Sequence, residues 1–178
     1  MEEARLLASQ VLFENPMVKI LVDTLEVQGK PRQYAYLVSP VEAVATVGMT
    51  SDGKLLLTRQ YRHPVNQVIY DLPAGRVNPG ETLIDAARRE FEEETGYYPE
   101  QIVPLCVYNQ FPGALRAATH LFFAQNLRRT EQHLDEGEVL EVEHVPVQEV
   151  LDWIADGRLV DGSLQLGVLL ARHKGYIP

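Results

Sequence analysis

The chain has 178 residues, 46% of them hydrophobic and 23% charged, a balance typical of a soluble domain large enough to bury a core. Its formal net charge of −9 argues against a general nucleic-acid-binding protein, which carries a basic surface. Because no apolar run could span a bilayer, the N-terminus does not resemble a secretory signal, and Cys106 is the single cysteine, we expect a cytoplasmic protein that does not bind membranes.

Strands dominate the predicted elements, and they begin with two hairpins. The first covers 18–39 with a turn at Gly29-Lys30-Pro31, and the second covers 41–61 with a turn at Ser51-Asp52-Gly53. Further strands are predicted over 67–75, 102–110, 119–127 and 139–147, and helices over 82–95, 147–156 and 163–173. Ser39-Pro40 is a natural break, so residues 1–40 are expected to form a separate N-terminal layer before a domain over 41–178.

The helix over 82–95 has recognisable ends and one apolar stripe. Thr82 and Asp85 resemble a capping box, and Gly96 stands where a left-handed C-cap is expected. The stripe predicted to face the core consists of Ile84, Ala87 and Phe91.

The same helix gathers acidic residues on another face. Glu93 and Glu94 follow Glu90 by three and four residues, so the three carboxylates cluster beside the loop 71–80 and repel one another. Hard divalent cations such as Mg²⁺ prefer carboxylate and carbonyl oxygens, and binding one would relieve that repulsion. The alternative is an ordinary solvated run of charge.

The order of residues decides between these interpretations. The residues Gly75, Glu81, Arg89-Glu90, Phe91, Glu93-Glu94, Gly96 and Tyr97 stand at the spacing of the Nudix box, without a gap. The chain therefore resembles the Nudix hydrolases, which cleave a nucleoside diphosphate linked to another group with Mg²⁺ or Mn²⁺. The resemblance implies an α/β fold, a mixed β-sheet sandwiched between helices, with an N-terminal β-hairpin layer.

The resemblance also implies roles for individual residues. Glu90, Glu93 and Glu94, with the backbone carbonyl of Ala74, match the metal ligands. Glu93 and Arg89 match catalytic positions, where the arginine orients the glutamates. The residues that match supporting positions of the loop and helix are Gly75, Glu81 and Gly96.

The substrate must be inferred from outside the box. Pro112, sixteen residues after Gly96, is similar to a proline of the ADP-ribose and nucleoside diphosphate sugar pyrophosphatases, in which an arginine at the position of Arg62 contacts phosphate. The resemblance implies hydrolysis of ADP-ribose to AMP and ribose 5-phosphate. The chain departs from that subgroup at Phe111-Pro112-Gly113, where a serine usually precedes the proline, and it lacks the acidic residue often found shortly afterwards. Arg116 is expected to take up a different contact, and Pro112 and Gly113 complete the expected substrate-binding residues.

Two further features follow from the resemblance. The general base of the subgroup comes from a late acidic loop, which here offers Glu136 and Glu138 around Gly137, and the sequence does not choose between them. In relatives the N-terminal segment is exchanged between subunits, which implies a homodimer. In those relatives the partner's aromatic residues pack on the substrate base, and the candidates for that contact in this chain are Phe13, Tyr34 and Tyr36.

Other functions compete with ADP-ribose hydrolysis. GDP-mannose or another nucleoside diphosphate derivative would use the same box. A sensor that binds ADP-ribose without cleaving it usually carries a degraded box and an added DNA-binding domain. Pro112 argues against a damaged nucleoside triphosphate as substrate, and the acidic charge argues against capped RNA.

Overall fold

A computed structural model describes residues 4–178, so residues 1–3 of the N-terminal segment predicted over 1–40 lie outside the described residues. The chain forms two compact units. The first contains the residues up to Glu42 together with Asn109–Ala118, and the second contains Ala43–Tyr108 and Thr119–Pro178. The segment Asn109–Ala118 belongs with the N-terminal residues because its short strand β9 (Leu115–Arg116) pairs in parallel with β3 (Lys30–Val38).

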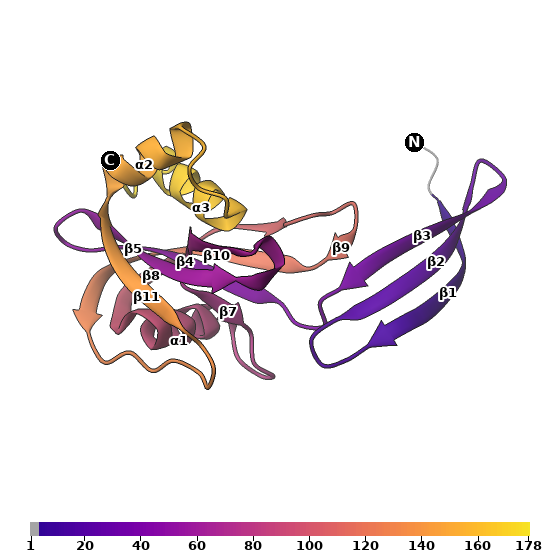
Figure 1. Ribbon diagram of the computed structural model, residues 1–178, viewed down its shortest axis with the longest axis horizontal. Coiled ribbons are helices and arrows are strands. Elements are labelled where there is room, and N and C mark those ends of the chain that lie inside the picture. Colours follow the sequence, from indigo (N-terminus) through magenta and orange to yellow (C-terminus); the bar gives the residue numbers. More distant parts are fainter. Residues whose placement is uncertain (1–3) are drawn as a thin grey trace. The chain divides into compact units, whose positions relative to one another are not determined.

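The first unit is a four-stranded sheet in the order β1-β2-β3-β9 (Figure 1). Strands β2 (Lys19–Val27) and β3 form the first predicted hairpin. Strand β1 (Arg5–Glu14) was not predicted from the sequence. Its pairing with β2 shifts register between Leu6 and Ala8 and again between Val11 and Phe13, so bulges break the two-residue alternation that reveals a strand.

The second unit is built on a larger mixed sheet in the order β11-β5-β4-β10-β8. Strands β4 and β10 are parallel, whereas β5 pairs antiparallel with both β4 and β11. The bounds are β4 (Ala43–Met49), β5 (Lys54–Arg62), β8 (Tyr97–Asn109), β10 (Ala118–Arg129) and β11 (Leu140–Pro146). The strand predicted over 67–75 is two strands, β6 (Gln67–Asp71) on β5 and β7 (Ala74–Arg76) on β4, and the 3-10 turn His63–Val65 precedes them.

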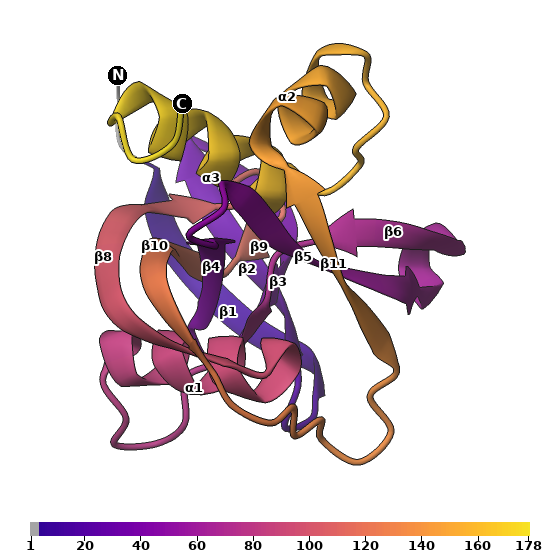
Figure 2. The ribbon, with the colours of Figure 1, turned by 90° about the vertical axis from the view of Figure 1, so that its left-hand side faces the viewer.

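Helices cover both faces of this sheet. Helix α1 (Leu83–Thr95) lies on one face, and α2 (Val147–Ala155) and α3 (Gly162–His173) lie on the other (Figures 1 and 2). Strand β10 supplies both cores: Leu121 and Phe123 join the cluster that includes α2 and α3, whereas Phe122 packs with Ala86 and Ala87 of α1. This is the sandwich that the resemblance implied. Within residues 4–178, no helix is long and apolar enough to cross a membrane.

The ends of α1 agree with the sequence. The Thr82 side chain accepts a hydrogen bond from the Asp85 backbone nitrogen, and Gly96 ends the helix with a φ of 72°. The predicted stripe holds for Ala87 and Phe91, which are fully buried. It is wrong for Ile84, which is 38% exposed because it lies in the first turn, beside an open apolar groove rather than under the sheet.

Candidate active site

The box brings two carboxylates against the backbone of β7. The Ala74 nitrogen donates a 3.1 Å hydrogen bond to Oε2 of Glu94, which is only 3% exposed. A Cβ atom on Gly75 would lie 2.1 Å from the carboxyl carbon of Glu90 and 2.2 Å from both of its oxygens. Only glycine therefore lets the Glu90 carboxylate lie directly on the backbone of β7.

Arg89 ties the helix to the loop before it. Its Nε and Nη2 donate to the two oxygens of Glu81 at 2.9 and 3.0 Å, and Nη2 also donates to the Arg76 carbonyl at 2.9 Å. Its Nη1 donates to Glu90 at 2.8 Å and to Glu93 at 2.9 Å. All five guanidinium protons therefore have an acceptor, so Arg89 fixes the box glutamates instead of reaching outward.

Burial makes Glu90 and Glu94 costly to ionise. It is the main cause that raises the pKa of Glu94 to about 8, and it also raises the pKa of Glu90. Glu81 behaves in the opposite way, because its hydrogen bonds with Arg89 lower its pKa. Glu90 and Glu94 are thus a pair of oxygen donors whose charge is unfavourable until a cation arrives.

The donor chemistry of this face suits a hard divalent cation, although the donors are not drawn together. Within residues 4–178, no three Asp, Glu, His or Cys side chains converge closely enough to form a ready metal cluster. The carboxylates of Glu90 and Glu93 are instead held by Arg89, and like charges without a cation stay apart. The Glu90 cradle on Gly75 and the all-oxygen donor set both fit Mg²⁺ or Mn²⁺.

The acidic loop between β10 and β11 is anchored to the end of α1. The backbone nitrogens of Thr130 and His133 donate 2.8 Å hydrogen bonds to the carbonyls of Gly96 and Glu93, and Gln132 Nε2 donates to the Glu94 carbonyl at 2.7 Å. Sequence reasoning missed this stem, because nothing in the segment 130–133 marks it as a helix cap.

Of the two candidate bases in this loop, Glu138 acts on the box. Its charge is among those that raise the pKa values of Glu90 and Glu94. Its carboxylate accepts a 3.2 Å hydrogen bond from the Asp135 nitrogen, and Gly137, with a φ of 89°, makes the turn before it. Both Glu136 and Glu138 are exposed on this loop.

Arg62 ends β5 and forms an ion pair with Asp71 of β6. Its Nε and Nη2 donate to Oδ2 of Asp71 at 2.9 and 2.6 Å. Asp71 in turn is one of the charges that raise the pKa of Glu94, which associates this pair with the box. Asp71 was not singled out from the sequence, since its importance depends on the pairing of β5 with β6.

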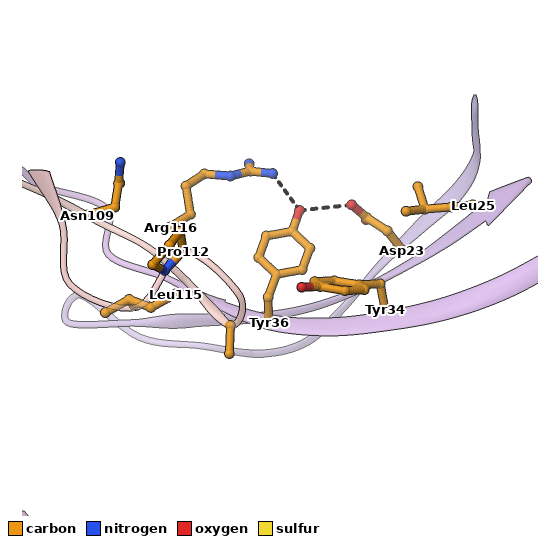
Figure 3. Close-up of a pocket in the computed structure, with 9 residues that line it drawn as sticks. Asp23, Leu25, Tyr34, Tyr36, Asn109, Pro112, Leu115 and Arg116 are labelled. Carbon is orange, nitrogen blue, oxygen red and sulfur yellow. Dashed lines mark hydrogen bonds between the residues drawn. The ribbon is translucent and has the colours of Figure 1, made fainter. Parts of the chain in front are cut away.

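Pro112 and Arg116 line a pocket of about 390 Å³ within the first unit. Figure 3 shows the Tyr36 hydroxyl between Asp23, to which it donates at 2.9 Å, and Arg116, which donates to it at 2.8 Å. The Arg116 guanidinium also lies 4.8 Å from the centre of the Tyr36 ring. The Gly113 carbonyl accepts a hydrogen bond from the Tyr34 hydroxyl. Two aromatic rings, a carboxylate and a cation thus line one pocket. Nothing in the sequence indicated that Asp23 would be part of it.

Comparison with known proteins supports the family that the box residues indicate. A family model described as NUDIX domain matches residues 40–163. A methanol dehydrogenase activator of Bacillus methanolicus is 31% identical over 168 residues, which cover 93% of this chain and 91% of that protein. An ADP-ribose pyrophosphatase of Bacillus subtilis is 29% identical over 163 residues, which cover 90% and 88%. A crystal structure of an ADP compounds hydrolase shares the fold, with a TM-score of 0.88 over 98% of this chain and 95% of that one, at 23% identity.

The box geometry and the family match define a hydrolase built on a mixed sheet between helices, the class in which divalent metal ions are generally required. The chain belongs to the Nudix family and is an enzyme of that family.

Proposed function

We propose that this enzyme hydrolyses the diphosphate bridge of a nucleoside diphosphate sugar, and that ADP-ribose is its substrate, giving AMP and ribose 5-phosphate. The observation that carries the proposal is the pair of carboxylates of the partly buried Glu90 and the buried Glu94, held against Gly75 and Ala74 on an intact box. The similarity to an ADP-ribose pyrophosphatase over most of both chains supports the choice of substrate.

The proposed cofactor is Mg²⁺, with Mn²⁺ as a substitute. The ligands would be the carboxylates of Glu90, Glu93 and Glu94 and the carbonyl of Ala74. When bound, such a cation neutralises phosphate oxygens and lowers the pKa of water. Arg89 keeps the glutamates oriented, and Glu81 keeps Arg89 in place through two hydrogen bonds.

We assign the general base to Glu138. Its charge acts on both Glu90 and Glu94, and an acidic group placed near a metal-bound water can accept a proton from it. Gly137 permits the loop to close over substrate and to open for release.

The substrate contacts belong to the same proposal. In the second unit, Arg62 would contact the diphosphate. The first unit holds the other expected substrate-binding residues, Pro112, Gly113 and Arg116, and its Tyr34 and Tyr36 offer rings on which a planar base would pack. Aromatic rings beside a guanidinium and a carboxylate offer both stacking and hydrogen bonding to such a base. A homodimer in the cytoplasm, as expected from the sequence, completes the proposal.

A turnover screen tests the reaction. The wild type is incubated with ADP-ribose, GDP-mannose, UDP-glucose and NADH, each with Mg²⁺ and separately with Mn²⁺, and the products are separated by chromatography. We expect AMP and ribose 5-phosphate as the fastest products. Faster cleavage of GDP-mannose would move the assignment to that sugar, and tight binding of ADP-ribose without turnover would identify a sensor.

Running the preferred reaction in ¹⁸O-labelled water locates the attacked atom. The label should appear on a phosphate of one product, because the box acts on the diphosphate bridge. Products whose phosphates carry no label would mean that the cleaved bond lies outside the diphosphate bridge and would refute the proposed reaction.

A further inference from the structure

Asp71 is a buried carboxylate for which the proposed reaction has no role so far. It ends β6, is 4% exposed, and stands opposite Thr58 in the register of the β5–β6 pair. Residues two apart on a strand share one face, so Thr58, Gln60 and Arg62 project on the same side of β5. All three side chains donate hydrogen bonds to Asp71.

The acceptor capacity of Asp71 is taken up by these donors. Thr58 Oγ1 donates to Oδ1 at 2.5 Å, and Gln60 Nε2 donates to both oxygens at 3.3 and 3.2 Å. Arg62 adds two bonds to Oδ2. A carboxylate that is held by three protein side chains and withdrawn from solvent is poorly placed to take a proton from water. Its role is instead to fix the positions of the side chains that donate hydrogen bonds to it.

Arg62 is held on one edge only. Nε and one proton of Nη2 point to the same oxygen of Asp71, and Arg62 has no other hydrogen-bond partner within residues 4–178. The guanidinium has five protons, so both protons of Nη1 and one of Nη2 remain available. The side chain is 45% exposed. Solvent or a ligand therefore reaches a planar set of donors whose orientation Asp71 has already fixed.

The charges around Arg62 indicate that it binds anions through directed hydrogen bonds more than through long-range electrostatic attraction. Besides Asp71, the partly buried Asp161 interacts electrostatically with Arg62. Asp161 itself caps the start of α3, where it accepts a 2.7 Å hydrogen bond from the Leu164 nitrogen. An arginine with two neighbouring carboxylates attracts anions weakly at long range. It can still form short, directed bonds to phosphate oxygens when one arrives.

We infer that Asp71 is a positioning residue, which holds Arg62 as a preformed fork for a phosphate group of the bound diphosphate. This inference rests on the proposed function, in which Arg62 contacts that group. Asp71 lies three residues before Ala74, so one short segment carries both the arginine's anchor and the proposed carbonyl ligand. The guanidinium of Arg62 would thereby keep a fixed orientation relative to the metal-binding face. A flexible arginine would have to be oriented anew each time a substrate binds.

A purely structural role is the competing explanation, in which Asp71 only fastens β5 to β6. The two roles differ in how Asp71 and Arg62 combine. A residue that acts through Arg62 has no effect on catalysis once Arg62 is gone, whereas a fastener of the hairpin adds its own loss. The comparison needs Asp71→Asn, Arg62→Ala and the double variant, with kcat, KM and Tm measured for each on the substrate that the screen identifies.

We expect Asp71→Asn and Arg62→Ala each to lower kcat/KM by about ten- to hundredfold, the loss expected for a charge-assisted hydrogen bond. Both losses should fall on the same kinetic parameter, and the double variant should be no worse than Arg62→Ala. The matched control is Arg59→Gln on the same strand. Arg59 is 42% exposed and paired with Glu141 at 2.9 Å, so it resembles Arg62 in exposure and pairing but has no place in the proposed site. It should keep wild-type kinetics.

A rescue measurement needs no change at Asp71 and so survives any loss of folding in Asp71→Asn. Guanidinium ion, added to Arg62→Ala well below denaturing concentrations, should occupy the Asp71 anchor and restore part of the activity. Methylammonium at the same concentration, which is a point charge without a planar fork, should restore less. Equal rescue by both ions, or none by either, would overturn the role given to Asp71.

The remaining outcomes are equally decisive. Losses that add in the double variant, with a parallel fall in Tm, would make Asp71 a fastener of the hairpin. A wild type that cleaves none of the diphosphate compounds would refute the proposed function, and this inference with it. An active wild type with additive variants would refute the inference alone.

Discussion

At the scale of single residues, Glu94 is the carboxyl group whose protonation the fold disturbs most strongly. Burial raises its pKa to about 8 from a usual value of 4.5. Between these two values the folded chain without metal binds more protons than the unfolded chain. The stabilising contribution of protonated Glu94 is therefore fully present below 4.5 and is lost as the pH rises through about 8.

We therefore predict that the protein in a chelating buffer unfolds at a lower temperature at about pH 8.5 than at about pH 5, by an amount equivalent to a few kcal/mol at most. In Glu94→Gln the neutral amide can still accept the hydrogen bond from Ala74, so the decline should flatten. Adding Mg²⁺ at the higher pH should stabilise the wild type and not the variant. Thermal unfolding followed by circular dichroism measures all three.

Glu81→Gln is the control for this measurement. It removes another carboxylate of the same network, but Arg89 lowers the pKa of Glu81, so its titration lies below the pH range tested. The variant should be less stable throughout and should keep the wild-type decline. A decline in Glu94→Gln as steep as in the wild type would assign the pH dependence to another group.

At the scale of elements, the acidic loop is the part of the site whose role the sequence left open. Glu138 acts electrostatically on Glu90 and Glu94. We predict that Glu138→Gln lowers kcat by about a hundredfold or more, the usual contribution of a positioned base, with little change in KM. Glu136→Gln is the control on the same loop and should stay near wild type. Steady-state kinetics at saturating Mg²⁺ decides, and full activity of Glu138→Gln would exclude it as the base.

Gly96 joins helix α1 to the stem of that loop. Its φ of 72° disfavours any side chain, and a Cβ atom there would lie 3.2 Å from the Gln132 nitrogen. We predict that Gly96→Ala destabilises the fold by about 1–2 kcal/mol and also lowers kcat, because the stem that places Glu138 must shift.

Gly157→Ala separates the two effects. Gly157 has nearly the same φ, 73°, but a Cβ atom there would meet no other atom within 4 Å, so only the backbone strain remains. This variant should lose stability in denaturant titration yet keep its kcat. Equal effects of the two substitutions on kcat would mean that a shift of the stem does not displace Glu138.

The elements also show what sequence patterns can predict. The box helix, its caps and its acidic face follow from local spacing, and the structure has them where expected. Strand β1 was not predicted because two bulges interrupt its alternation of apolar and polar residues. The role of Asp71 was not predicted for a different reason. Asp71 contacts Thr58, Gln60 and Arg62 only after β5 and β6 pair, and no spacing along the chain encodes that register.

At the scale of the whole molecule, the first unit exposes more apolar surface than a stable sheet should. No residue of β1, β2 or β3 is buried, and every residue of β1 is exposed. The large apolar side chains of β1, about half exposed each, are Leu6, Leu7, Val11, Leu12 and Phe13. Small sheets need a packed face, and apolar patches of this kind mark interaction sites, so we propose that a second copy of the chain covers β1.

We therefore predict that the protein sediments with twice the 20.1 kDa mass of one chain, and that Leu12→Lys shifts it toward the monomer because the patch would then hold an unpaired charge. Leu169→Lys is the control, since Leu169 is 47% exposed on α3 of the other unit, and it should leave the mass unchanged. Sedimentation equilibrium at several concentrations makes the comparison. A wild type that remains monomeric at micromolar concentration, or equal dissociation by both lysines, would show that β1 is not the interface.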